Sequence, residues 1–151
     1  ITMKRTTQNF ILLALLMAGT IWLGCSDDNN PLAPSSLAGT WKLAIYTDKA
    51  MNVTANAGVP TDIGNGAKIT ITGTIVLTEK RYTYSLTITT SVPGAPPQTQ
   101  TINSAGTYSI RGAVITAVED GTGETTVFTM SRSGNRLTLD NSEENSVWDK
   151  Q

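Results

Sequence analysis

Residues 106–140 read GTYSIRGAVITAVEDGTGETTVFTMSRSGNRLTLD, and this stretch decides the fold. Apolar residues alternate with threonine and other polar residues, and the turn pairs Arg111-Gly112, Asp120-Gly121 and Gly134-Asn135 interrupt the alternation. Successive side chains of a β-strand point to opposite faces, and glycine and asparagine tolerate the positive φ of tight hairpins. The stretch therefore predicts short antiparallel strands that follow one another in hairpins.

The same two-residue period extends in both directions along the chain. Trp41, Leu43 and Ile45 alternate with Lys42 and Ala44, and threonine-rich runs of the same period follow. We predict eight strands, over residues 38–47, 67–78, 81–91, 98–110, 113–119, 124–132, 135–140 and 145–150. Sequential strands with short connections are usually neighbours, and pairing of the first strand with the last removes both exposed edges. The predicted fold is all-β, an eight-stranded antiparallel up-and-down barrel.

The strand pattern alone leaves three points of this fold open. An immunoglobulin-like sandwich has a similar strand count and turn spacing, and it is the alternative architecture. Residues 48–66 form one long connection, which either covers a mouth of the barrel or is a surface loop without function. A barrel of eight strands is either filled by its own side chains or holds one small ligand.

The beginning of the chain has the pattern of an export signal. Two basic residues precede an uncharged apolar run, residues 10–23, which as a helix is shorter than the hydrocarbon core of a membrane. Residues 1–24 are therefore predicted to be a helical signal peptide rather than a spanning anchor. Residues 25–36 follow as a polar, proline-containing tether, and residues 37–151 as the barrel domain.

The only cysteine of the chain stands where the apolar run ends. The segment Trp22-Leu23-Gly24-Cys25 resembles the lipobox of bacterial lipoprotein precursors, although that family usually has leucine where this chain has Trp22. The resemblance implies cleavage before Cys25, a diacylglycerol on its thiol and an acyl chain such as palmitate on its new amino group. Such an anchor would hold the protein on a membrane. Ser26, in place of the aspartate that retains inner-membrane lipoproteins, implies the outer membrane of a bacterial envelope.

The composition excludes several classes of function. Without the two basic residues of the signal, nine basic and twelve acidic residues remain, a net charge of −3, and no basic stripe is available for nucleic acid. The chain has no histidine and no second cysteine, so the commonest zinc and copper ligands and the usual general base are missing. Most carboxylates flank turns. We therefore predict no enzymatic activity, no metal and no cofactor, while the oligomeric state stays open.

A family resemblance lies in the barrel region. Gly39-Thr40-Trp41, in the first predicted strand, resembles the Gly-x-Trp signature of the lipocalins, and most closely that of bacterial lipocalin-like lipoproteins. Phe128, the segment 134–139 (GNRLTL) and Val147-Trp148 match the end of that pattern. The resemblance implies a plug at the closed end of the barrel, formed by Gly39, Trp41 and a basic residue of the last strand, here Lys150, packed on the ring by a cation–π contact.

The resemblance implies binding rather than catalysis, in a cavity for a small hydrophobic ligand. By parity along the strands, the side chains expected to point inward are Leu43, Ile45, Ile71, Ile75, Tyr82, Tyr84, Leu86, Tyr108, Phe128 and Met130. They either line such a cavity or fill the core. Two other classes of function stay open, namely a structural or protein-binding module of the envelope and an adhesion or carbohydrate-binding domain.

Overall fold

The structure of the protein, a computed structural model, describes residues 34–151. The predicted signal peptide, Cys25 with its lipobox and most of the tether lie outside the described residues. The elements in chain order are α1 (Pro34–Leu37), β1 (Gly39–Asp48), β2 (Val53–Asn56), β3 (Thr61–Gly64), β4 (Ala67–Leu77), β5 (Arg81–Ser91), β6 (Gln98–Arg111), β7 (Val114–Glu119), β8 (Thr125–Ser133), β9 (Arg136–Asp140) and β10 (Glu144–Lys150). The buried apolar side chains form one cluster between Leu37 and Trp148, so this part of the chain contains its own core.

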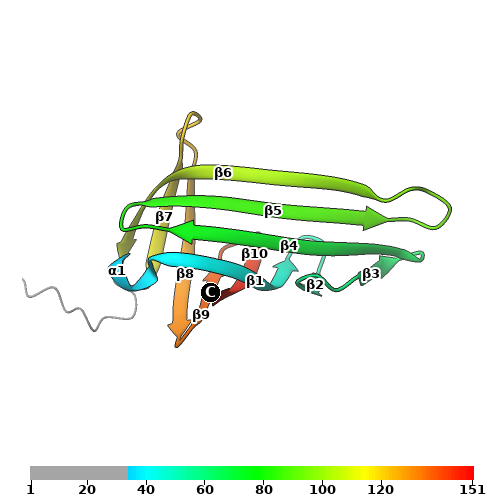
Figure 1. Cartoon of the computed structure of the whole chain (residues 1–151), viewed down its shortest axis with the longest axis horizontal. Coiled ribbons are helices and arrows are strands. Elements are labelled where there is room, and N and C mark those ends of the chain that lie inside the picture. The colour runs from blue at the N-terminus through cyan, green and yellow to red at the C-terminus, as the bar shows by residue number, and fades with distance from the viewer. Residues whose placement is uncertain (1–33) are drawn as a thin grey trace, which may run out of the picture.

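Eight of these strands close into a barrel (Figure 1). From β4 to β10 each strand pairs antiparallel with the next one in the chain, and β1 pairs with both β10 and β4. Trp41 of β1 lies opposite Lys150 on one side and opposite Ile75 on the other. The predicted eight-stranded antiparallel up-and-down barrel is confirmed. The sandwich alternative is wrong, because one closed sheet contains all the strands of residues 34–151.

The long connection contains the two remaining strands, which the sequence pattern did not predict. β1 and β4 pair with each other over Gly39–Lys42 only, and beyond this segment β2 pairs with β1 while β3 pairs with β4. The amide of Ala57 donates to the Ala44 carbonyl at 2.9 Å, and that of Gly58 donates to the Ile71 carbonyl at 2.8 Å, so the connection joins both walls. It is therefore part of the barrel wall rather than an irregular surface loop.

A β-bulge at Ala44 changes which side chains of β1 face the interior. Leu43 lies opposite Trp148, but Ile45 lies opposite the very next residue of β10, so Ala44 has no partner of its own. An extra residue shifts the two-residue period by one position. The inward position after the bulge therefore belongs to Tyr46, which lies opposite the buried Ser146.

The prediction that Ile45 points inward is corrected by this register. Its partner in β2 is the exposed Asn56, whereas the partner of Tyr46 in the same strand is Ala55, which is 1% exposed. Ile45 thus lies on the outer face of the wall. A parity count along the sequence cannot detect an inserted residue, and this is why the count failed after Leu43.

Candidate functional site

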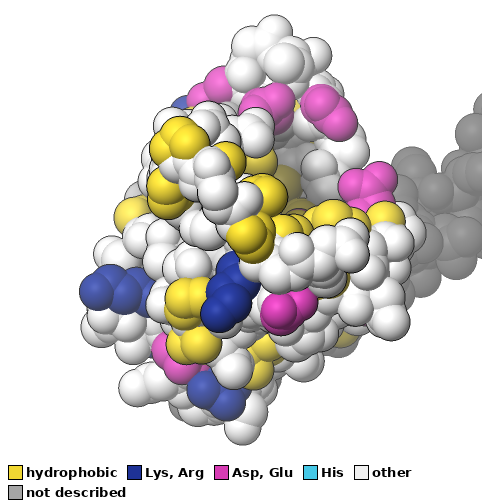
Figure 2. All heavy atoms as spheres, turned by 90° about the vertical axis from the view of Figure 1, so that its right-hand side faces the viewer, with side chains coloured by type: hydrophobic (Ala, Val, Ile, Leu, Met, Phe, Trp, Pro, Cys, Tyr) yellow, Lys and Arg dark blue, Asp and Glu magenta, His cyan; other side chains and the backbone are white. Residues whose placement is uncertain are grey.

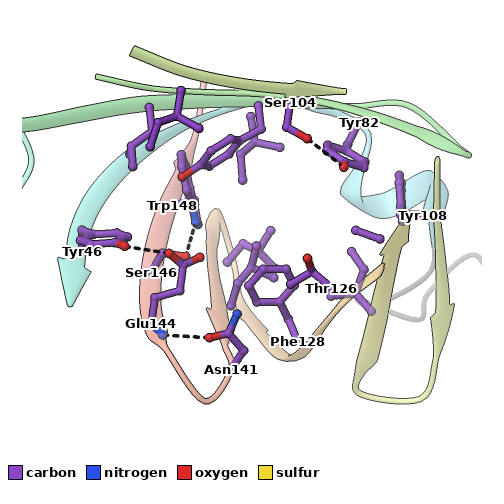
Figure 3. A pocket seen from close by; sticks show the side chains of 18 of the residues that line it. Tyr46, Tyr82, Ser104, Tyr108, Thr126, Phe128, Asn141, Glu144, Ser146 and Trp148 are labelled. Atoms are coloured by element: carbon purple, nitrogen blue, oxygen red, sulfur yellow. Dashed lines mark hydrogen bonds between the residues drawn. The ribbon is translucent and has the colours of Figure 1, made fainter. Parts of the chain in front are cut away.

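The barrel encloses a cavity of about 370 Å³. Volumes in this range are typical of sites that bury a small molecule. The wall is mostly apolar and aromatic and comes from β1, β4 to β10 and the turn before β10; the lining residues are Tyr46, Ile75, Leu77, Tyr82, Tyr84, Leu86, Ile88, Ile102, Ser104, Tyr108, Ile115, Ala117, Thr126, Phe128, Leu137, Leu139, Asn141, Glu143, Glu144, Ser146 and Trp148. Figure 3 shows most of these side chains around the space between the two sides of the barrel.

The segment to which the family resemblance assigned a plug is buried at one end of the barrel. Trp41 is 0% exposed, and its indole Nε1–H donates to the Leu37 carbonyl at 2.8 Å. Lys150 Nζ lies 5.4 Å from the centroid of the Trp41 ring, within the range of a cation–π contact. A Cβ on Gly39 would lie 2.9 Å from Lys150 Cε, so a glycine at this position leaves room for the lysine. The structure therefore brings Gly39, Trp41 and Lys150 together.

A second cation belongs to the same plug and was not identified from the sequence. Arg132 of β8 places its Cζ atom 5.6 Å from the Trp41 ring centroid. Its Nη1 donates to the Ser36 carbonyl at 2.7 Å, and Lys150 Nζ donates to the same oxygen at 3.3 Å. Ser36 of α1 is thus tied to two strands that lie 96 and 114 residues later in the sequence at the points of contact, so this end of the barrel is held from both β8 and β10.

The ten side chains predicted to point inward fall into three groups. Leu43, Ile71 and Met130 are buried in the core, at 6%, 2% and 2% exposure, and do not line the cavity. Ile45 lies on the outer face, as described above. The other six line the cavity, namely Ile75, Tyr82, Tyr84, Leu86, Tyr108 and Phe128. The barrel therefore combines a packed layer with a hollow one. A filled core and an open cavity were the two arrangements left open by the sequence, and each is present in one part of the interior.

The polar part of the wall was missed because it begins in a turn. The Oδ1 atom of Asn141 accepts hydrogen bonds from the amides of Glu143 and Glu144, both at 2.8 Å, and so fixes the turn before β10. Glu144, Ser146 and Trp148 then alternate along the inward face of β10. The sequence does contain a signal for this part of the wall. Glu144 and Ser146 are separated from Trp148 by an even number of positions, so all three side chains point to the same face of β10.

Glu144 is the carboxylate of this face, and it is partly buried. The Tyr46 hydroxyl donates to its Oε2 atom at 2.8 Å, and Figure 3 shows Tyr46, Glu144 and Ser146 together on one side of the cavity. Burial raises the pKa of the Glu144 carboxyl, and the negative charges of Glu143 and Asp48 raise it further, while the hydrogen bond from Tyr46 opposes the shift.

The raised pKa of Glu144 makes its charged form a cost to the fold. At a pH below the ordinary carboxyl pKa, the group is protonated in both the folded and the unfolded chain and has no effect. As the pH rises from the ordinary value towards the raised one, the unfolded chain releases its proton first. The free energy of unfolding therefore falls over that range. A carboxylate that weakens the fold in this way is a candidate for a binding role.

Aromatic side chains surround this carboxylate. The rings of Tyr84 and Trp148 meet edge to face, with 6.0 Å between their centroids, and Trp148 Nε1 donates to Ser146 Oγ at 2.9 Å. Burial raises the pKa of the Tyr46 and Tyr84 hydroxyls, and the nearby Glu144 carboxylate raises both further. Both tyrosines are therefore neutral at physiological pH, and they can take part in hydrogen bonds as donors or acceptors.

No family model matches this chain, and no curated protein matches it. A lipocalin-like protein from Bacteroides uniformis ATCC 8492 is a similar solved structure, with 17% identity, a TM-score of 0.43, and coverage of 76% of this chain and 98% of that one. An uncharacterized protein from Bacteroides eggerthii DSM 20697 is similar at 10% identity and a TM-score of 0.44, with the same coverage. The barrel assignment rests on the strand pairing itself.

Within residues 34–151, no three histidine, cysteine, aspartate or glutamate side chains are grouped as a metal site requires. No helix of the same range is long and apolar enough to cross a membrane.

Proposed function

We propose that this chain is a lipid-anchored envelope lipoprotein whose lipocalin-like barrel binds a small hydrophobic molecule. The observation that carries the proposal is the cavity of about 370 Å³ with apolar and aromatic walls. The fully buried Trp41 lies at one end of the barrel, and Figure 2 shows the molecule from the opposite end, where a hollow lies among hydrophobic side chains. A site of this shape shields most of a small ligand from water.

The walls of the cavity favour an apolar occupant for a simple physical reason. Each square ångström of apolar surface removed from water contributes about 25 cal/mol, and both the ligand and the wall lose such surface on binding. Dispersion contacts that the hollow layer lacks in the free protein are gained at the same time. The few polar groups of the wall orient the ligand rather than hold it alone.

A neutral dye tests the binding proposal. N-phenyl-1-naphthylamine fluoresces more strongly outside water, and we expect saturable binding to residues 26–151, which contain the whole described core. Ala117 lines the cavity, whereas its neighbour Val118 is 37% exposed on the outer face. We expect Ala117→Phe to fill the cavity and reduce dye affinity by about tenfold or more, a loss of about 1.4 kcal/mol. Val118→Phe is the matched control and should leave the dye affinity unchanged.

The outcome of the dye experiment is decisive in both directions, provided that both variants show the circular dichroism spectrum of the parent. An equal loss in both variants would place the dye elsewhere on the surface. An absence of saturable binding to the parent chain would contradict the proposed function.

The lipid anchor is the second part of the proposal, and it rests on the sequence around Cys25. We expect Cys25→Ser to abolish incorporation of radiolabelled palmitate, because the thiol is the atom that would carry the diacylglycerol. Ser26→Ala is the matched control, since it changes the next residue but keeps the thiol, and it should retain the label. Palmitate that still enters Cys25→Ser would refute the assignment of this cysteine as the anchor.

A further inference from the structure

We infer that the ligand of this cavity carries a protonated amine, which the Glu144 carboxylate binds while the apolar body of the ligand lies against Tyr84 and Trp148. This inference rests on the proposed function and names the chemical class of the molecule bound. It is carried by three observations, which are the partly buried Glu144 carboxylate in the cavity wall, the lack of a salt bridge to it from a basic residue of 34–151, and the aromatic rings of the same wall.

The Glu144 carboxylate has unused hydrogen-bonding capacity. An ionised carboxylate accepts about four hydrogen bonds, and the structure supplies one to this side chain, from the Tyr46 hydroxyl at 2.8 Å. The carboxylate lines the cavity, so a donor on a bound molecule can reach the remaining positions. An ammonium group, which has three donors and no acceptor, is complementary to such a site.

No basic side chain within residues 34–151 forms a salt bridge with Glu144. Lys49 directly follows Asp48, the residue of β1 that lies opposite Glu144. Its Nζ atom lies 2.9 Å from Asp140 of β9 and forms a salt bridge there instead. The other charged residues around this end of the cavity are acidic, namely Asp48 opposite Glu144 in β1 and Glu143 in the turn. A cation is therefore the missing partner of this group.

The strands on the other side of the cavity supply no counter-charge either. Residues 82–110, which form nearly all of β5 and β6, contain no charged residue. The side chains that these strands contribute to the cavity are apolar or carry hydroxyl groups, among them Tyr82, whose hydroxyl is 3.1 Å from Ser104 Oγ. A ligand cation in the cavity would therefore meet one negative wall and no positive one.

The aromatic rings favour the same class of ligand. The π face of tyrosine and tryptophan attracts a cation, and this contribution grows when the cation is shielded from water. Tyr46, Tyr84 and Trp148 line the same cavity as Glu144, and Glu144 is close enough to Tyr84 to raise its pKa. A carboxylate partly removed from water without a cationic partner is costly. A neutral ligand leaves that cost in place, an anionic ligand adds repulsion, and a cationic ligand removes it.

Three ligands with the same eight-carbon chain test the inference. At pH 7 octylamine is positively charged, octanol is neutral and octanoate is negatively charged. Displacement of N-phenyl-1-naphthylamine from residues 26–151 gives the affinity of each. We expect octylamine to bind about tenfold or more tighter than octanol, because hydrogen bonds in which the acceptor or donor is charged are the stronger ones. Octanoate should be the weakest of the three.

Glu144→Gln keeps the size of the side chain and an acceptor for the Tyr46 hydroxyl, but it removes the charge. We expect the ratio of octylamine affinity to octanol affinity to fall to about one in this variant. Glu124→Gln removes a carboxylate from the exposed turn between β7 and β8 and should change neither affinity. At pH 7 Glu144→Gln should also melt at a higher temperature than the parent, which shows that lost amine binding does not come from unfolding.

The possible failures are distinguishable. If the dye and octanol bind but octylamine binds no tighter than octanol, this inference is wrong and the proposed function stands. If octylamine keeps its advantage in Glu144→Gln, the amine is recognised elsewhere and the inference is equally wrong. If neither the dye nor any of the three ligands binds the parent chain, the proposed function itself fails.

Discussion

Trp41→Ala is expected to destabilise the barrel by about 3 to 5 kcal/mol, the usual cost of removing a large buried aromatic side chain. Trp41 is 0% exposed and lies at the point where the sheet closes, between Lys150 of β10 and Ile75 of β4. Its removal leaves a cavity, and it also leaves the Leu37 carbonyl without its hydrogen-bond donor. The free energy of unfolding, from urea denaturation followed by circular dichroism, measures the loss.

Two companion variants separate the parts of this effect. Trp41→Phe keeps an aromatic ring for Lys150 and Arg132 but loses the indole N–H, so we expect a smaller loss of about 1 to 3 kcal/mol. Lys42→Ala changes the neighbouring exposed side chain and should stay within about 0.5 kcal/mol of the parent. A Trp41→Ala protein with the unfolding midpoint of Lys42→Ala would show that the ring does not plug the barrel.

The hairpins of the barrel could be predicted because each of them is specified locally. The range predicted from the sequence, 81–91, coincides with β5, since a tight turn precedes it and a proline-containing turn follows it. The pair β1 with β2 lacks such a signal, whereas β3 and β4 are joined by Asn65-Gly66, both at positive φ, which is a typical two-residue hairpin turn that the predicted strands did not include. β2 and β3 are each only four residues long, and they are stabilised by pairing with β1 and β4, which separate only in the three-dimensional structure. The local sequence of β2 and β3 does not indicate that β1 and β4 separate beyond Lys42.

The candidate site could be predicted only where the two-residue period is unbroken. In β5 the period correctly places Tyr82, Tyr84 and Leu86 in the cavity wall. In β1 the bulge at Ala44 reverses it, so that Tyr46 takes the inward place expected for Ile45. Glu144 follows a turn rich in polar residues, where a carboxylate is usually a solvated charge. Its role depends on the burial that β1 and β9 impose from either side of β10, and this is a property of the closed barrel.

Gly106→Ala is expected to be the most damaging glycine-to-alanine change within residues 34–151, with a loss of at least about 3 kcal/mol or failure to fold. A Cβ at this position would lie 2.0 Å from the Val118 carbonyl oxygen and 2.9 Å from Tyr82 Cε1. The first contact is to backbone and cannot be relieved by a change of side-chain rotamer. Only a glycine allows β6 to approach β7 this closely.

The position of Gly106 explains why the backbone cannot yield. It lies in β6 where the strand, until then paired only with β5, begins to pair with β7 as well, opposite Glu119. A shift of β6 would therefore break the pairing on one side or the other. The same shift would move Tyr82, which lines the cavity, so any Gly106→Ala protein that folds should also bind N-phenyl-1-naphthylamine more weakly than the parent.

Gly94→Ala is the matched control for Gly106→Ala, because an added Cβ there meets open space. Its φ of +80° costs an alanine about 1 to 2 kcal/mol, a penalty of backbone strain alone. Gly106 has no such φ, so its larger expected loss comes from the contact with Val118. Thermal and urea unfolding of both variants measure the difference. Equal losses would mean that β6 and β7 can separate without cost, and that the barrel corner at Gly106 does not depend on the missing side chain.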